Sequence, residues 1–204
     1  HLEARQKKTV YNNIGVLYIE EKDPIKAEEY FLKAYTIAKQ IGDEEQIGAC
    51  AVNLALLANE MGKVDVASDY IEEAEPLLDK KKNVILLAKI ARVENLLLRN
   101  QLVQAERLAL KTLPQLNNLS IVAEGATVNS KITLLLIISN IYKQQNNYQK
   151  AREYALIARS EQQNIEGRIE IYERLSTLYP TKDVLPIAMA YKDSVQIASD
   201  SLDA

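Results

Sequence analysis

A helix-pair pattern that recurs five times constrains the fold of this chain more than any other feature. Its best copy runs from Tyr11 to Lys39 and predicts two amphipathic helices joined by a turn at Lys22, Asp23 and Pro24. Small and apolar residues recur at helical spacing on one face of each helix. Neither helix can bury that face alone, so each pair needs neighbouring pairs. The pattern therefore predicts an all-helical stack of repeats.

An alanine near the start of the second helix marks each copy. These alanines are Ala27, Ala67, Ala105, Ala151 and Ala188, separated by 37 to 46 residues. We expect about ten helices, over residues 3–21, 25–40, 44–61, 64–80, 83–99, 102–116, 121–145, 148–163, 167–179 and 184–201. An alternative for the seventh is a break near Gly125 with a restart at Asn129. The repeats would cover residues 8–43, 44–83, 84–120, 121–164 and 165–204 of one domain, 1–204.

Residues at fixed offsets within these copies resemble the tetratricopeptide repeat. The first copy carries Tyr11, Ile14, Gly15, Tyr18, Ala27, Phe31 and Ala34; the second keeps Leu54, Ala55, Gly62, Ala67, Ile71 and Ala74. The fourth and fifth copies keep Leu135, Ile138, Ser139, Tyr142, Ala151, Ala155 and Ala158, then Tyr172, Leu175, Ser176, Tyr179 and Ala188. The third is weakest, with Lys89 and Arg92 at positions that the family fills with apolar residues. The resemblance implies a right-handed superhelical solenoid of about five helix pairs.

Composition and residue types argue against several classes of function. Net charge is -3, with acidic and basic residues interspersed, so the chain lacks the clustered basic surface of a nucleic-acid binder. The longest apolar run, residues 134–138, is too short to cross a bilayer. His1 is the single histidine, Cys50 the single cysteine, and the sequence contains no Gly-rich phosphate loop. We expect no catalytic site, metal or cofactor; the alternative is an all-helical enzyme with a tuned carboxylate pair in a cleft.

The resemblance implies that the first helices of successive pairs line a concave groove that binds a protein or peptide segment. The residues placed there are Asn12, Val16, Ile19, Asn53, Leu56, Asn59, Ile90, Glu94, Leu97, Leu136, Asn140, Lys143, Glu173 and Thr177. Apolar side chains alternate with asparagines, which donate and accept hydrogen bonds and so suit a peptide backbone. The alternatives are that these asparagines are ordinary surface residues, or that apolar residues such as Leu56 and Ile90 pack inside the solenoid.

The family's best-known peptide site is a clamp of Lys, Arg and Asn that holds a C-terminal carboxylate. Asn12, Val16, Val52 and Leu56 stand at the clamp positions of the first two copies. The clamp is therefore absent, and an extended or helical segment with apolar anchors is the better prediction.

The closing segment, AMAYKDSVQIASDSLDA, resembles the end of tetratricopeptide sensor regions in bacterial membrane-anchored signalling regulators. The similarity rests on Tyr191, Lys192 and the run from Ser199 to Leu202. It implies a periplasmic rather than a cytoplasmic location, and a membrane link only through a flanking transmembrane segment. Because the chain begins with His1 rather than an initiator methionine, we expect an internal fragment or mature segment of a longer protein. The alternatives are a cytoplasmic adaptor in a protein assembly, and a homodimer in which a second copy fills the groove.

Overall fold

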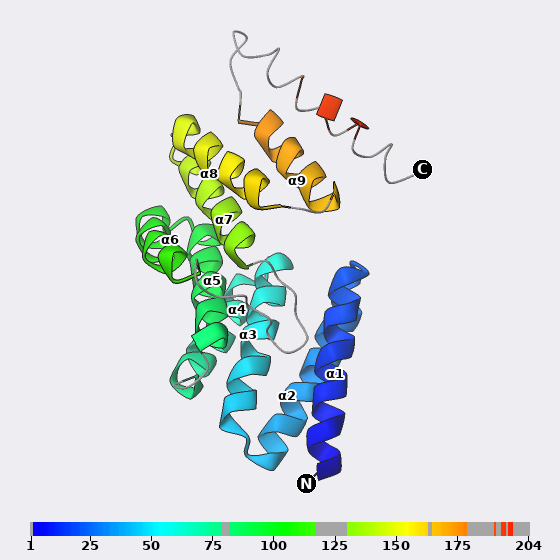
Figure 1. The fold of residues 1–204 in the computed structure, drawn as a ribbon. Coiled ribbons are helices and arrows are strands. Elements are labelled where there is room, and N and C mark those ends of the chain that lie inside the picture. Colours follow the sequence, from blue (N-terminus) through cyan, green and yellow to red (C-terminus); the bar gives the residue numbers. More distant parts are fainter. Residues whose placement is uncertain are drawn as a thin grey trace. The chain divides into compact units, whose positions relative to one another are not determined.

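The structure, a computed structural model, describes residues 2–78, 82–116, 130–162 and 165–178, with five single residues between 190 and 197 (Figure 1). All secondary-structure elements in these ranges are helices, which confirms the all-α prediction. The chain forms two compact units, His1–Ser130 and Lys131–Ala204, and each is considered by itself. No helix of the described residues is long and apolar enough to cross a membrane.

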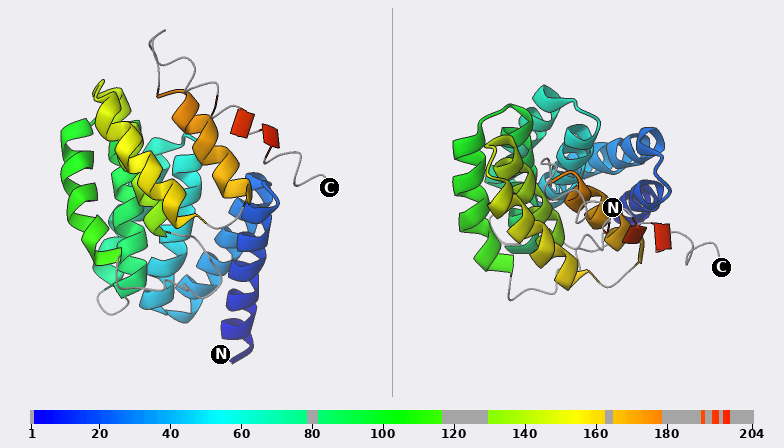
Figure 2. Two further views of the ribbon diagram at one scale, coloured as in Figure 1. Left: turned by 45° about the horizontal axis from the view of Figure 1, so that its top comes forward. Right: turned by 90° about the horizontal axis from the view of Figure 1, so that it is seen from above.

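The first unit contains three helix pairs. Its elements are α1 (Leu2–Glu20), α2 (Pro24–Ile41), α3 (Glu44–Glu60), α4 (Val64–Ala74), the 3₁₀ turn η1 (Glu75–Leu77), α5 (Lys82–Leu98) and α6 (Leu102–Leu116). Each helix packs against the next within a pair, and α3 also packs against α2 and α5 of the neighbouring pairs. Within this unit the pairs lie side by side, as the two views of Figure 2 show.

The same turn joins the two helices of every described pair. Its central residue has a left-handed backbone and lies five positions before the marker alanine: Lys22 (φ 58°), Gly62 (φ 70°), Asn100 (φ 59°) and Asn146 (φ 58°). In each case this residue and the next donate their N–H groups back to the preceding helix, which satisfies its last carbonyls. The third copy thus has the register set by Ala105, despite its polar substitutions.

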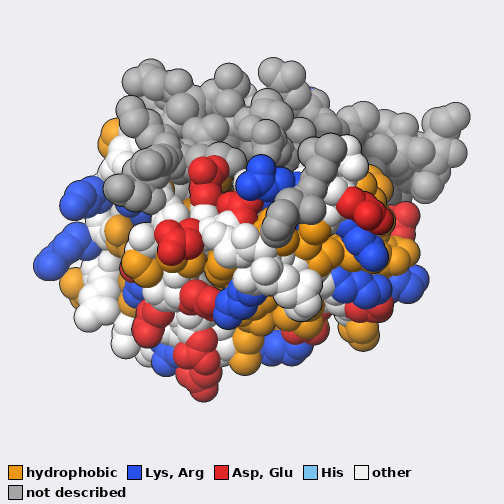
Figure 3. Space-filling view, turned by 90° about the horizontal axis from the view of Figure 1, so that it is seen from below, with side chains coloured by type: hydrophobic (Ala, Val, Ile, Leu, Met, Phe, Trp, Pro, Cys, Tyr) orange, Lys and Arg blue, Asp and Glu red, His pale blue; other side chains and the backbone are white. Residues whose placement is uncertain are grey.

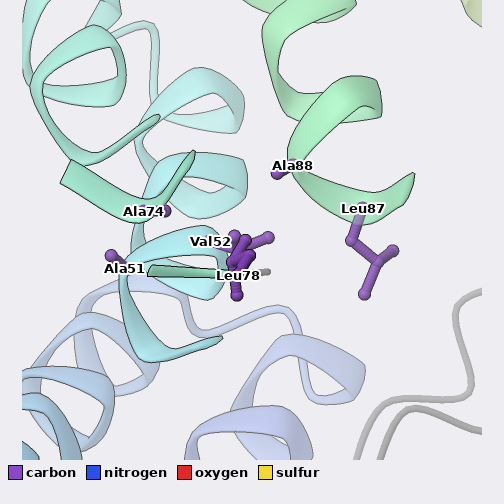
Figure 4. Packing of buried hydrophobic residues seen from close by; sticks show 6 residues of the cluster. All are labelled: Ala51, Val52, Ala74, Leu78, Leu87 and Ala88. Atoms are coloured by element: carbon purple, nitrogen blue, oxygen red, sulfur yellow. The ribbon is translucent and has the colours of Figure 1, made fainter. Parts of the chain in front are cut away.

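The core of the first unit consists of small residues that let the helices approach and larger ones that fill the space between pairs. Ala27 and Phe31 of α2 pack against Leu54 and Leu57 of α3. Figure 4 shows the next cluster, in which Ala51, Val52, Ala74, Leu78, Leu87 and Ala88 come together from α3, the end of the second pair and α5. Both clusters bury apolar surface that a single pair would leave exposed.

The expected fourth helix, residues 64–80, is too long by at least one turn. The α-helix ends at Ala74 and passes into the 3₁₀ turn Glu75–Leu77. Pro76 is the physical reason, because in a continued α-helix its ring would clash with the carbonyl four residues earlier, and it has no N–H to donate.

The second unit contains α7 (Ser130–Gln144), α8 (Tyr148–Glu161) and α9 (Ile165–Ser176). Tyr142 of α7 stacks on Tyr154 of α8 with ring centroids 5.6 Å apart. The buried Ser139 hydroxyl donates to the Ala151 carbonyl at 2.8 Å, and α8 packs against α9. The expected start of the seventh helix at 121, its alternative break at Gly125 and most of the tenth helix lie outside the described residues.

Candidate functional site

Two helices of the first unit present matching polar and apolar stripes. Asn12, Val16 and Ile19 lie on one side of α1, and Asn53, Leu56 and Glu60 lie on one side of α3. The spacing of three or four residues keeps each set on one face of its helix. From Cys50 to the end of α3, these three residues are the ones that are not buried. We call these six residues, with Glu94 of α5, the first-helix face.

An asparagine pair joins the two stripes across successive repeats. The Asn53 side-chain Nδ2 donates to Asn12 Oδ1 at 2.8 Å. That bond uses one donor of Asn53 and one acceptor of Asn12, so the Asn12 NH₂ group and the Asn53 oxygen remain to bind another amide. The structure therefore brings together two of the residues that the sequence predicts for peptide binding.

Apolar side chains continue the face beyond the asparagine pair. Val16 and Ile19 pack partly against the cluster around Phe31, and Leu56 packs partly against Ile71 and its neighbours. All three remain partly exposed, so each anchors in the core and still offers apolar contact surface.

A pocket of about 470 Å³ lies at the N-terminal end of the face. It is lined by Arg5, Lys8, Thr9, Ile41, Gly42, Asp43 and Glu44. Lys8 is only 6% exposed and its ammonium lies 3.6 Å from the Asp43 carboxylate. The sequence analysis missed this pocket, although Lys8 lies one helical turn before Asn12 and so continues the same stripe.

The charge of Glu60, at the C-terminal end of α3, acts on Glu94 of α5. Burial raises the pKa of Glu94 to about 7, the negative charge of Glu60 adds to that rise, and a hydrogen bond from Asn59 opposes it. Glu60 itself is exposed at the last position of α3. This end of the face is therefore acidic, while the pocket at the other end contains two cations and two carboxylates.

Four of the predicted groove residues are buried. They are Asn59 (3% exposed), Ile90 (1%), Leu97 (6%) and Leu136 (8%). The Asn59 amide is used within the fold, since it donates to the Ala91 carbonyl at 2.8 Å and accepts from Asn95 at 3.1 Å. These four side chains contribute packing rather than accessible contact surface. The alternative interpretation expected this of the apolar residues but not of Asn59.

The remaining predicted residues lie in the second unit. Lys143 of α7 and Thr177, just after α9, meet through a 3.0 Å hydrogen bond from the lysine Nζ to the threonine hydroxyl. Asn140 is partly exposed on α7, and Glu173 is exposed on α9. Two of the four are thus brought into contact.

Two observations on the described residues concern metal binding and thiol chemistry. They contain no group of three His, Cys, Asp or Glu side chains that could hold a metal ion. Burial raises the pKa of the Cys50 thiol to about 11, so it stays protonated and unreactive at neutral pH. Acidic and basic side chains are interspersed on the face drawn in Figure 3.

Comparison with known proteins gives two family matches. A family model described as Tetratricopeptide repeat matches residues 8–80, and a second with the same description matches residues 132–156. No curated protein sequence matches the chain significantly.

Several solved structures share the fold. BtubC (BKLC) from P. vanneervenii has a TM-score of 0.67 at 16% identity, covering 93% of this chain and 78% of that one. The apo form of RapI has a TM-score of 0.64 at 15% identity, covering 96% and 71%. A Podosopora anserina protein assigned as a kinesin light chain, with nearly identical TPR-like repeats, has a TM-score of 0.61 at 14% identity and covers 95% of both chains.

These likenesses show the fold, and the two family matches fall on helix pairs that share one turn geometry. Residues 8–80 and 132–156 therefore match the tetratricopeptide repeat, a repeat found generally in non-catalytic scaffolds that bind proteins or peptides.

Proposed function

We propose that the first-helix face binds an extended peptide segment of a partner protein. The observation that supports this proposal is the hydrogen bond between Asn12 and Asn53, which joins two repeats. The Asn12 NH₂ group can still donate to a peptide backbone, and the Asn53 side-chain oxygen can still accept from it. Val16, Ile19 and Leu56 flank the pair and supply apolar contact for side chains of the same segment. Backbone hydrogen bonds with alternate side-chain contacts are a common mode of peptide recognition.

We further propose that the chain is the sensor or interaction region of a bacterial signalling or transcriptional regulator. The resemblance of residues 188–204 to the end of such sensor regions supports this role. In it, the sensor lies in the periplasm and reaches the membrane only through a flanking segment. Peptide binding would then change the curvature of the stacked repeats and so its docking to a neighbouring domain.

A peptide array tests the binding function. The 204-residue chain is incubated with random seven-residue peptides whose termini are acetylated and amidated, and the Kd of enriched peptides is measured by fluorescence anisotropy. We expect Asn12→Ala and Asn53→Ala each to raise Kd about tenfold, the equivalent of one lost hydrogen bond of about 1.4 kcal/mol.

The matched control is Asn13→Ala, which removes an exposed asparagine next to Asn12 on another side of α1. It should leave the Kd unchanged, and thermal melts followed by circular dichroism check that every variant folds. Equal losses in Asn13→Ala and Asn12→Ala would place the binding surface elsewhere.

The regulator role is tested by the sequence of the parent gene. We expect the reading frame to continue past Ala204 into an apolar segment of about 20 residues, long enough to cross a membrane, followed by an output domain. A stop codon shortly after Ala204 would contradict the sensor role and leave the peptide-binding proposal standing.

A further inference from the structure

We infer that two copies of the chain associate through α1, which pairs in antiparallel orientation with α1 of the second copy. This helix lies at one end of the row of helices in the first unit (Figure 1). The surface that pairs is one side of the helix, which we call the outer stripe: Lys7, Val10, Ile14, Leu17 and Glu21. Spacings of three and four residues keep these five side chains together. The first-helix face lies on another side of α1, so this dimer leaves it free to bind a peptide.

The centre of the outer stripe is apolar and accessible. Val10 is 53% exposed and Leu17 is 55% exposed. Ile14 lies between them and is partly exposed. A single exposed apolar side chain is ordinary on a protein surface, but three on one side of a helix are the pattern by which two helices pack together.

The second repeat shows what covers a stripe of this kind. The corresponding residues of α3 lie forty positions later and are each 2% exposed: Cys50, Leu54 and Leu57. Leu54 and Leu57 pack against Ala27 and Phe31, so a helix, α2, covers that side of α3. The apolar centre of the outer stripe therefore fits another helix as its partner.

The charged ends of the outer stripe indicate which helix that is. Lys7 and Glu21 stand where α3 and its C-terminal turn have Ile47 and Met61. Neither charged residue forms an ion pair with another residue that the structure describes, and the Lys7 ammonium lies 5.9 Å from the centre of the Tyr11 ring. A cation at one end and an anion at the other require a partner with the opposite order of charges.

A second copy in antiparallel orientation has that order. With a two-fold axis beside Ile14, Lys7 faces Glu21 of the second copy, and Val10 faces Leu17 of the second copy. The axis repeats each contact, as in other isologous dimers. Parallel pairing would instead place like charges together at both ends, which is unfavourable.

The length of the outer stripe limits the strength of the dimer. Lys7 and Glu21 are fourteen residues apart, which corresponds to about 21 Å along the helix. Glu21 continues the last turn of α1, because its N–H donates to the Leu17 carbonyl at 2.9 Å. One helix pair of this length buries little surface compared with a permanent dimer, so we expect a Kd on the order of 10 µM.

Sedimentation equilibrium of the 204-residue chain measures this association. We expect Lys7→Glu and Glu21→Lys each to raise the dimer Kd at least about tenfold, because each places like charges together twice in the dimer. The matched control is Lys111→Glu, at an exposed lysine of α6, which makes the same change in net charge as Lys7→Glu. It should change the Kd less than about twofold.

An equal mixture of the two charge variants tests the antiparallel orientation. In the mixed dimer every acidic side chain of the outer stripe faces a basic one, so the mixture should associate within about threefold of the wild-type Kd. The apolar centre is tested by Val10→Asp, which should raise the Kd at least about tenfold. Its control is Val103→Asp, at a valine of α6 that is 69% exposed and should not affect the dimer.

Thermal melts followed by circular dichroism check that every variant folds. A wild-type chain that stays monomeric up to about 1 mM would overturn the inference. So would a dimer that Val10→Asp leaves intact, or a mixture of charge variants that associates no better than either variant alone. Since the outer stripe shares no residue with the first-helix face, each of these results leaves the peptide-binding proposal standing.

Discussion

Gly15 shows how tightly one residue constrains the packing of α1 on α2. A Cβ atom at this position would lie 2.6 Å from two ring carbons of Phe31, closer than real side chains approach. The sequence pattern predicts a small residue here and an aromatic at Phe31. It does not predict that the ring lies directly on the glycine, because side-chain packing across two helices is a tertiary property.

Replacing Gly15 by alanine tests this packing, because the sign of the change in the free energy of unfolding depends on it. In an exposed helix, Gly→Ala stabilises by about 1 kcal/mol. At Gly15 the new methyl group overlaps the Phe31 ring, so we expect Gly15→Ala to destabilise the chain by about 1–3 kcal/mol. Urea unfolding followed by circular dichroism measures the change.

The control for this prediction is a double-mutant cycle with Phe31→Leu. Removing the ring should reduce the cost of Gly15→Ala by at least about 1 kcal/mol, because the two residues are in contact. If Gly15→Ala instead stabilises the chain, the Phe31 ring does not pack directly on Gly15.

Glu94 gives a prediction about pH. Its pKa is raised from 4.5 to about 7 in the folded chain, so the folded state binds the proton more tightly than the unfolded state. The stability associated with this group is fully present below pH 4.5 and is lost as pH rises through 7. Glu94→Gln should therefore stabilise the chain by about 1–3 kcal/mol at pH 8 and have little effect at pH 4.

Urea unfolding of wild-type, Glu94→Gln and Glu72→Gln chains between pH 4 and pH 8 measures this difference. Glu72 is exposed, so its variant should follow the wild type at every pH. A constant difference between Glu94→Gln and wild type over that range would show that Glu94 does not titrate in the folded chain near neutral pH.

The sequence pattern does not predict which residues of a helix face are covered by a neighbouring repeat. Helical spacing correctly identified Asn12 and Asn53 as accessible, and placed Asn59 on the same side. The structure buries Asn59 because Asn95 and the Ala91 carbonyl on α5 bind its amide. Periodicity assigns a residue to a side of its own helix, but the partner that covers it comes from another repeat.

Among the elements, the turns were the most predictable and the interhelical hydrogen bonds the least. The marker alanines gave the register of all four described pairs, and Pro76 explains the helix end that the pattern placed too late by the widest margin, that of α4. By contrast, no sequence motif predicts that Asn95 forms hydrogen bonds between helices. It donates to Asn59 at 3.1 Å and to the Val64 carbonyl at 2.8 Å, joining α5 to both helices of the preceding pair.

Removing this connection should weaken the junction between the second and third pairs. Asn95 is 5% exposed, so Asn95→Ala leaves the buried Asn59 oxygen without this donor and leaves the part-buried Val64 carbonyl with only the longer bond from Arg99, at 3.5 Å. Each unsatisfied buried group costs about 1–3 kcal/mol, and we expect a total loss of about 2–4 kcal/mol. Urea unfolding measures the loss; Asn13→Ala, at an exposed position, should change stability by less than 0.5 kcal/mol, about the limit for a surface substitution. Equal effects would show that the Asn95 bonds do not stabilise the junction.

For the whole chain, the sequence predicted the order and pairing of the helices but not the division into two units. Short-range periodicity shows which helices form a hairpin. Contacts between residues far apart in the sequence decide which hairpins form one compact unit. The composition does not change near residue 130, so it does not indicate the boundary. That the 204 residues form a single domain therefore stays a prediction.

In the first unit, repeats contact their neighbours, so local damage should spread to the adjacent pair and fade beyond it. Phe31 packs with residues of α1 to α4, whereas Ile71 packs with Ala55 and Ala91 of α3 and α5. Truncation to alanine should cost about 3–5 kcal/mol at Phe31 and about 2–5 kcal/mol at Ile71. In hydrogen exchange measured by mass spectrometry, Phe31→Ala should accelerate exchange chiefly in α1 to α4, and Ile71→Ala in α3 to α5. If both variants accelerate exchange equally from α1 to α6, the three pairs open as one cooperative unit. The position of a lost contact would then not determine which helices exchange faster.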